Sequence, residues 1–132
     1  NMQVERLPGM AEPRVELARR LKRAGNFSGA MQRLDEALRL RPDDPTILIV
    51  LGECWQHLRQ FAKALEFYEQ AVVRSESIAP TDDAAKLARY RAAVLAAALG
   101  QADFAREHFR AILVADPDYK DTRERLDKLG PN

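Results

Sequence analysis

Cys54 and His57 are the pair of residues whose types and spacing could do chemistry. They lie three residues apart, so a helix would place them on similar sides. An imidazole beside a thiol could then activate it as a nucleophile. No motif supplies a third partner or an oxyanion site, and Cys54 sits between Glu53 and Trp55 in a place typical of packing. We therefore expect Cys54 to be a buried structural cysteine, and we predict that the protein is not an enzyme.

Other chemical motifs are absent from the sequence. Gly25 and Gly29 are four apart, but no Gly-Lys-Ser/Thr follows them, so they indicate a turn residue and an isolated glycine near a helix start. One cysteine and two histidines cannot form a structural zinc site without carboxylates. His108 is expected on an outer helix surface. The prediction is therefore no catalytic residue, no metal site and no cofactor.

The composition is that of a folded domain. The chain has 132 residues, 46% of them hydrophobic and 31% charged, which suits one domain with a packed core. Its longest uncharged apolar run, 92–99, is far shorter than the roughly 20 residues of a membrane span. The single cysteine and the lack of a leader favour the cytoplasm, with a periplasmic or membrane-tethered parent protein left open. Residues 1–10 are expected to be a tail or tag remnant.

The helices that would position Cys54 and His57 belong to a pattern that repeats along the chain. Apolar positions coincide when the chain is shifted by 34 residues, and again after a further 41. Each copy predicts two helices, because apolar residues recur at helical spacing on both sides of a break such as Gly25-Asn26. The coinciding residues include Leu17 and Leu51, Leu21 and Trp55, Phe27 and Phe61, Ala30 and Ala64, Leu34 and Tyr68, Ala37 and Ala71, Ala64 and Ala105, and Tyr68 and Phe109.

This pattern resembles the tetratricopeptide repeat, a 34-residue helix–turn–helix unit that ends in proline. Three copies are present, and they depart from the family pattern at Arg59, Glu76 and Ala102. The resemblance implies an all-α fold, a right-handed superhelical solenoid of antiparallel helix pairs. The matching residues are Leu17, Ala18, Leu21, Gly25, Phe27, Ala30, Leu34, Ala37 and Pro42, then Leu51, Gly52, Trp55, Phe61, Ala64, Tyr68 and Ala71, then Ala92, Ala93, Gly100, Ala105, Phe109 and Pro117.

We expect one domain over residues 11–132, because three stacked pairs are near the minimum that buries its apolar faces. The repeats are placed at about 11–44, 45–78 and 86–119, with a capping helix at about 119–129. Seven extra residues precede the third copy, at about 79–85. They are either a tolerated loop insertion or an extra wall for a partner, and the helix after them should run over about 82–99.

Protein binding is the function that the resemblance implies, because the first helix of each pair lines a concave groove in this family. The matching bands begin at Glu12, Thr46 and Leu87, and are basic at one end and apolar at the other. They suit a protein or peptide that carries acidic and apolar residues. The implied partner-binding residues are Val15, Arg19, Lys22, Arg23, Ile49, Glu53, Gln56, His57, Leu87, Tyr90, Arg91 and Val94. The alternative is that Arg19 and Glu53 simply pair with each other, and that part of the third band belongs to the core or is covered by the N-terminal tail.

The sequence argues against two particular kinds of partner, the C-terminal carboxylate of a chaperone and a nucleic acid. Some tetratricopeptide co-chaperones grip a chaperone's C-terminal carboxylate with Lys, Asn and Arg residues. Those places hold Val15, Arg19, Val50, Leu87 and Arg91, and only Arg91 has the expected type. Net charge alternates along the chain, from +4 over residues 11–41 to −5 over 42–85 and +2 over 86–132, which argues against a nucleic-acid footprint. The function that remains open beside peptide binding is self-association, as a module of a larger protein.

Overall fold

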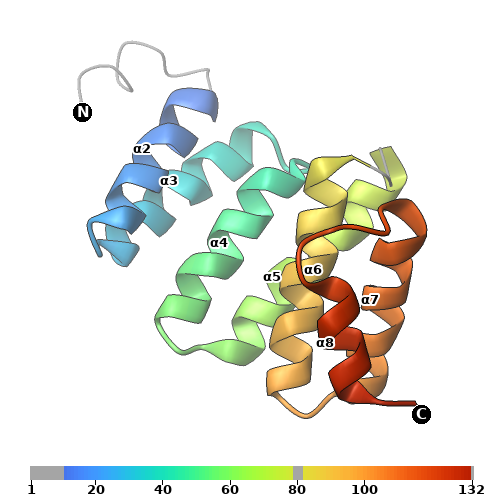
Figure 1. Ribbon diagram of the computed structural model, residues 1–132. Coiled ribbons are helices and arrows are strands. Elements are labelled where there is room, and N and C mark those ends of the chain that lie inside the picture. The colour runs from blue at the N-terminus through green and yellow to red at the C-terminus, as the bar shows by residue number, and fades with distance from the viewer. Residues whose placement is uncertain (1–10, 79–81, 132) are drawn as a thin grey trace. The chain divides into compact units, whose positions relative to one another are not determined.

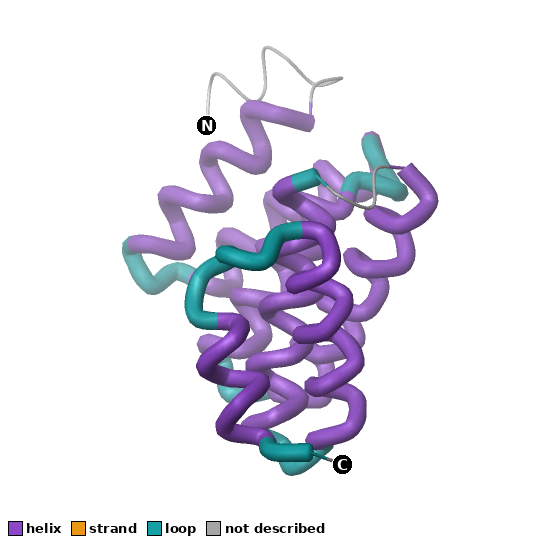
Figure 2. The backbone as a smooth tube through the Cα atoms, turned by 45° about the vertical axis from the view of Figure 1, so that its right-hand side comes forward, coloured by secondary structure: helices purple, strands orange, loops and turns teal. Residues whose placement is uncertain are grey.

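The computed structural model describes residues 11–78 and 82–131, and within them it contains helices and loops but no strand (Figures 1 and 2). The predicted N-terminal tail, residues 1–10, lies outside this description. The helices follow one another with short connections. They are α2 (Ala11–Arg23), α3 (Phe27–Leu40), α4 (Pro45–His57), α5 (Phe61–Ile78), α6 (Asp83–Ala98), α7 (Ala102–Ala115) and α8 (Thr122–Leu129).

The turn inside each helix pair has a residue in the left-handed backbone region at the same place of the repeat. Gly25 has φ 84°, Arg59 φ 63° and Gly100 φ 82°. Glycine adopts this conformation without steric cost, whereas a side chain is strained in it. Arg59 therefore departs from the pattern in residue type but keeps the backbone geometry.

Polar side chains fix the starts of three helices. Asn26 accepts a hydrogen bond from the Gly29 amide before α3, and Asp44 accepts one from the Thr46 amide before α4. Asp82 does the same before α6, with the Ala85 amide as donor. Each cap satisfies an amide that has no partner inside the helix, which contributes about 1 kcal/mol.

The chain divides into two compact units, and the boundary falls inside α5. Unit 1 is Asn1–Phe67 and unit 2 is Tyr68–Asn132. In unit 1, α3 packs against both α2 and α4. Its core is made of small and branched side chains, so that the helices approach closely. The fully buried members are Ala11, Ala18, Ala30, Leu34, Ala37, Ile47, Val50, Leu51 and Cys54.

Unit 2 is built around α7, which packs against α6 and α8. Helix α6 contributes mainly alanines to the core, and α7 contributes the larger Phe109 and Ile112. Small residues on one helix let the large side chains of the next lie against its backbone. Ala93 and Ala105, which match the repeat pattern in the third copy, are both fully buried.

The seven extra residues lengthen two helices. Helix α5 has 18 residues against 14 in α3, and α6 has 16 against 13 in α4. The increases of four and three residues together account for the seven. Of the expected insertion at 79–85, Asp83, Ala84 and Ala85 belong to the first turn of α6, and residues 79–81 lie outside the described part of the chain.

The capping helix α8 is held by α7. Arg106, only 8% exposed, donates from Nε to the Gly130 carbonyl (2.9 Å) and from Nη2 to the Leu129 carbonyl (3.2 Å). These acceptors are carbonyls at the C-terminal end of α8, where a helix lacks internal partners. A buried guanidinium thus both finds its hydrogen bonds and caps the helix.

Candidate functional site

Helices α2 and α4 of unit 1 carry eight of the predicted partner-binding residues. On α2, Arg23 is exposed, while Val15, Arg19 and Lys22 are half-buried. On α4 the exposure falls toward the start of the helix: His57 is exposed, Glu53 and Gln56 are half-buried, and Ile49 is only 3% exposed. The charged members therefore have more accessible surface than Ile49.

Glu53 pairs with Lys22, not with Arg19. Lys22 Nζ lies 3.4 Å from Glu53 Oε1, across from α2 to α4. Lys22 is one turn further along α2 than Arg19, and that turn brings it level with Glu53. Among the described residues Arg19 and Arg23 have no ion pair, so this end of α2 keeps two guanidinium groups available.

His57 stacks on Phe27. The ring centroids are 5.0 Å apart and the planes are 12° from parallel. The pair joins the end of α4 to the start of α3 in unit 1 and leaves His57 exposed. We call the surface formed by the eight predicted residues of α2 and α4 the α2–α4 surface. The stacked rings of His57 and Phe27 lie at its edge.

Cys54 is fully buried, as predicted. Burial raises the pKa of its thiol to about 11, and the nearby Lys22 ammonium lowers it only in part. At neutral pH the thiol is protonated and is a poor nucleophile. No group of three or more His, Cys, Asp or Glu that could hold a metal ion occurs within residues 11–78 and 82–131.

The expectation that His108 lies on the outer surface is wrong. Its ring is half-buried, with Nδ1 3.0 Å from Arg89 Nη1 of α6 and with the Phe104 ring centroid 4.4 Å away. Burial lowers the pKa of His108, and the Arg89 charge lowers it further. His108 therefore packs between α6 and α7 as a neutral ring, to whose Nδ1 Arg89 donates.

In unit 2, the predicted residue Tyr90 is engaged with the capping segment. Its hydroxyl donates to Asp121 Oδ1 (2.5 Å) and accepts from Arg125 Nε (3.2 Å). Its ring meets Tyr119 edge-on, with centroids 5.8 Å apart. Burial, followed by the bond to Asp121, raises the pKa of Tyr90, and the same bond lowers the pKa of Asp121.

The other predicted residues of α6 differ in exposure. Arg91 is exposed, whereas Leu87 and Val94 are half-buried. These three residues and Tyr90 lie on one helix: Tyr90 and Arg91 are neighbours, with Leu87 three residues before Tyr90 and Val94 three residues after Arg91. The available surface of α6 is therefore a narrow apolar strip beside the Arg91 guanidinium.

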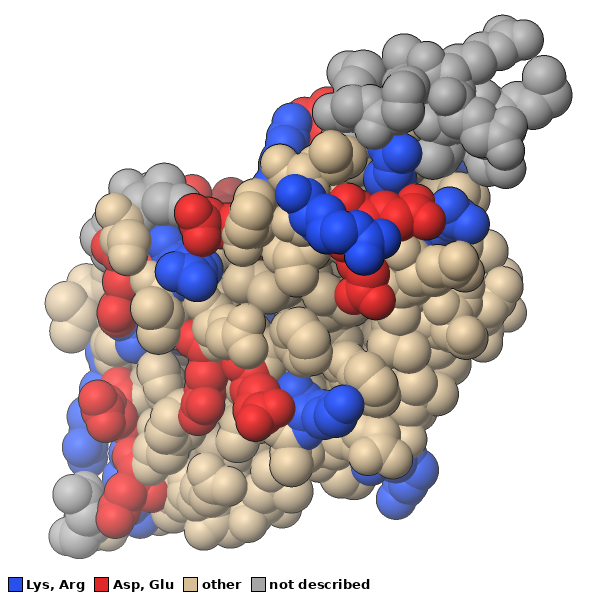
Figure 3. All heavy atoms as spheres, turned by 180° about the vertical axis from the view of Figure 1, so that it is seen from behind, with Lys and Arg blue, Asp and Glu red and all other residues tan. Residues whose placement is uncertain are grey.

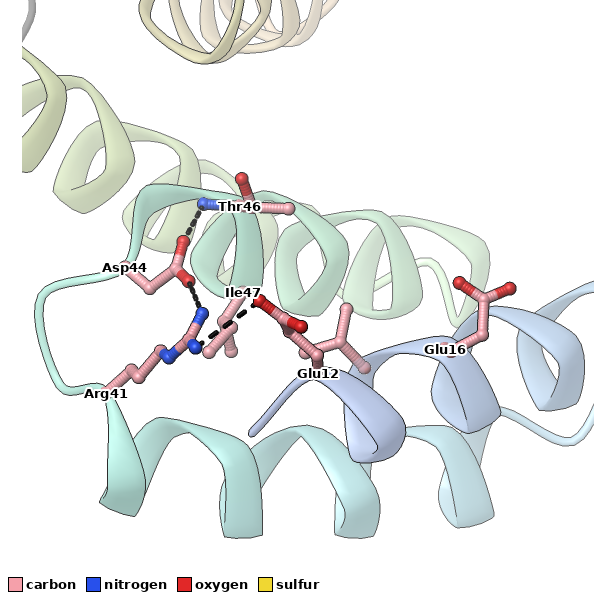
Figure 4. Close-up of a pocket in the computed structure, with 7 residues that line it drawn as sticks. Glu12, Glu16, Arg41, Asp44, Thr46 and Ile47 are labelled. Atoms are coloured by element: carbon pink, nitrogen blue, oxygen red, sulfur yellow. Dashed lines mark hydrogen bonds and ion pairs between the residues drawn. The ribbon is translucent and has the colours of Figure 1, made fainter. Parts of the chain in front are cut away.

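Sequence reasoning missed a pocket at the other end of α2. This pocket, the α2–α4 pocket, has a volume of about 420 Å³. It lies at the first turns of α2 and α4 and at the segment between α3 and α4 (Figure 4). Glu12 and Thr46 had been placed in the predicted bands, but Glu16, Arg41 and Asp44 had not. Its lining residues are Glu12, Val15, Glu16, Arg41, Asp44, Thr46 and Ile47.

Charges of both signs are interspersed on one face of the protein. On the face shown in Figure 3, Lys and Arg side chains alternate with Asp and Glu side chains. Four cations of residues 11–41 are already paired in unit 1: Arg14 and Arg33 with Glu36, Lys22 with Glu53, and Arg41 with Glu12 and Asp44. In the described part of the chain, no helix is both long and apolar enough to cross a membrane.

Solved structures share this fold. The first tetratricopeptide domain of Spaghetti (RPAP3), bound to the HSP90 peptide SRMEEVD, is 18% identical, with a TM-score of 0.78 over 90% of this chain and 91% of that chain. The N-terminal domain of the stress-induced protein STI-1 from C. elegans is 20% identical, with a TM-score of 0.79 over 92% and 94%. MamA is 14% identical, with a TM-score of 0.80 over 97% of this chain and 71% of that chain.

Searching curated proteins by sequence finds no match. The family model for the tetratricopeptide repeat, by contrast, matches residues 15–83, which is just over half of the chain. The seven helices of residues 11–78 and 82–131 fit three repeats and a capping helix. The chain therefore belongs to the tetratricopeptide repeat family, and its fold is that family's α-solenoid of helix pairs.

Proposed function

We propose that the domain is a non-catalytic adaptor that binds a peptide or a helix of another protein. The α2–α4 surface of unit 1 is the main site, and α6 of unit 2 offers a second strip. The observation that carries the proposal is the pair of guanidinium groups of Arg19 and Arg23, which have no ion pair among the described residues. Solvent-accessible cations beside half-buried apolar side chains suit an amphipathic ligand.

The peptide-bound RPAP3 domain supports this class of function, because a similar fold there holds a peptide. We expect a different peptide preference here. Val15, Val50 and Leu87 replace the polar residues of the carboxylate clamp, and Val50 is buried. Apolar side chains cannot donate to a terminal carboxylate, so SRMEEVD should bind at least tenfold more weakly than to RPAP3.

The experiment is a pull-down from the lysate of the source organism, followed by affinity measurements on the purified partner. The test variant is Arg19→Glu/Arg23→Glu, and the matched control is Arg39→Glu, an exposed arginine of α3. Reversal of two interface charges should weaken binding at least tenfold, while the control should bind as wild type. Equal affinity for all three proteins would place the site elsewhere.

Self-association is the alternative, and one observation favours it. Val73 and Val114 occupy equivalent places of the second and third repeats, and they are 58% and 88% exposed. A Val73→Asp/Val114→Asp variant should lose any dimer that wild type forms. A monomeric mass for wild type at all concentrations would remove this alternative.

The proposal places the protein in the cytoplasm, because its single cysteine, Cys54, can form no disulfide within the chain, as is usual in a reducing compartment. Immunodetection after fractionation of the source cells tests this. The chain in a periplasmic or membrane fraction would contradict it.

A further inference from the structure

The α2–α4 pocket is large enough for a ligand side chain. Its volume of about 420 Å³ falls in the range of roughly 300–1,000 Å³ that is usual for binding pockets. Val15, one of the predicted partner-binding residues, lines it. A ligand that contacts Val15 would therefore reach the pocket.

Three carboxylates and one guanidinium line the pocket. Arg41 lies 3.4 Å from Glu12 and 3.8 Å from Asp44, and Asp44 also caps α4. Glu16 stands one turn further along α2, and no interaction reaches it (Figure 4). Among the described residues it has no ion pair, although Arg19 and Arg20 follow it by one turn. The pocket thus has two excess negative charges and one available carboxylate.

We infer that the α2–α4 pocket receives a Lys or Arg side chain of the bound peptide. Val15 and Ile47 give an apolar wall for the aliphatic stem, and the Glu16 carboxylate, which stands apart from the Arg41–Glu12 pair (Figure 4), is left for the cationic head. An acidic side chain would meet three carboxylates there. An apolar side chain would remove Glu16 from water without replacing its hydrogen bonds.

This inference rests on the proposed function and makes the ligand more specific. Glu12, Glu16, Arg19 and Arg23 follow one another at spacings of three or four residues and share one face of α2. At 1.5 Å per residue, Glu16 and Arg23 are about 10 Å apart along the axis. An extended peptide covers that distance in about three residues. The ligand should carry a basic residue and, about three positions away, an acidic one.

The probe is a synthetic library of eight-residue peptides with blocked ends and randomised positions. It is screened against wild type, Glu16→Gln and the control Glu66→Gln, an exposed glutamate of α5 in unit 1. Peptides selected by wild type should be enriched in Lys or Arg with Asp or Glu about three positions away. Fluorescence anisotropy on the best peptide should show about threefold weaker binding to Glu16→Gln and no change with Glu66→Gln.

A charge swap makes the test independent of folding defects. Glu16→Lys should bind the selected peptide about tenfold or more weakly, and should regain affinity when the peptide's basic residue is replaced by Glu. The pocket inference would be overturned if the selected peptides lacked a basic residue, or if Glu16→Gln and Glu16→Lys both bound the peptide as tightly as wild type. Either result would leave the proposal of peptide binding intact. If folded wild type selects no peptide at all, both the adaptor proposal and the pocket inference are wrong.

Discussion

Arg59 occupies a backbone conformation that glycine provides in the other two repeats. A left-handed residue with a side chain costs about 1–2 kcal/mol. The Arg59 guanidinium lies 5.6 Å from the Phe61 ring centroid, which returns at most about 0.5–1 kcal/mol at an exposed site. The strain therefore exceeds the gain.

We accordingly predict that Arg59→Gly raises the free energy of unfolding by about 0.5–1 kcal/mol. The measurement is the urea midpoint followed by circular dichroism. Gly25→Arg, at the equivalent turn, is the opposite substitution and should lower stability by about 1 kcal/mol. A decreased midpoint for Arg59→Gly would show that the arginine stabilises the turn.

His108 should make unit 2 sensitive to acid. Its pKa is lowered in the folded state by burial and by Arg89, from an ordinary value of 6.5. Between the folded pKa and 6.5 the unfolded chain binds more protons, so stability falls as the pH falls through that range. Protonation would also remove the acceptor that Nδ1 offers to Arg89.

The test compares thermal midpoints at pH 7.5 and pH 5.5. His108→Asn retains an acceptor oxygen but does not titrate, so its midpoint should fall less than that of wild type. His57→Asn, at the exposed histidine, is the control. Parallel losses in wild type and His108→Asn would assign the acid sensitivity to other groups.

At the scale of elements, α8 depends on the Arg106 guanidinium. We predict that Arg106→Leu costs about 2–3 kcal/mol and frays α8, because the carbonyls of Leu129 and Gly130 lose a charged donor. Hydrogen exchange of the α8 amides measures this. Arg39→Leu, at an exposed place of α3, is the matched control. Unchanged exchange in α8 would mean that packing alone holds the helix.

The helices could be predicted from the sequence, but the contacts that hold α8 to α7 could not. These contacts depend on the residue type at one position of the third repeat. Met31 and Leu65 hold that place in the first two repeats, and Arg106 holds it in the third. The change from apolar to charged was visible in the sequence. Its meaning was not, because the acceptors of Arg106 are backbone carbonyls about 24 residues away, and no sequence pattern encodes them.

Side-chain partners of the site were less predictable than its helices. Periodicity placed Arg19 and Lys22 on the right helix, but the choice of Lys22 as the partner of Glu53 depends on one turn of offset between α2 and α4. Arg41 and Asp44 each precede a proline, a pattern that indicates the end of a helix but no pocket. Their shared pocket with Glu12 and Glu16 arises only when α2 folds against α3.

At the scale of the whole molecule, the chain consists of two compact units that share α5. Repeats are stabilised mainly by their nearest neighbours. Damage in α7 should therefore be felt first within unit 2.

We predict that Ala105→Arg, which places a charge and a long side chain in a fully buried position, costs at least about 3 kcal/mol. Amide protection measured by hydrogen exchange should fall more in α6–α8 than in α2 and α3. Ala115→Arg, on the exposed end of α7, is the control. Equal loss of protection in both units would show that the chain unfolds as a single cooperative body.

The lengthening of α5 and α6 suggests a rule for the tolerated sizes of such insertions. Four added residues turn a helix by about 400°, and three turn it by about 300°, so both additions stay within about 60° of a full turn. The additions lie at the end of α5 and at the start of α6, so the connection leaves α5 and enters α6 at nearly the same angular positions as in a shorter pair. Two residues added to either helix alone would turn its attachment point for the connection by about 200°. Helix pairs of this kind should therefore lengthen, in evolution or by engineering, by about seven residues at a time, three or four in each helix.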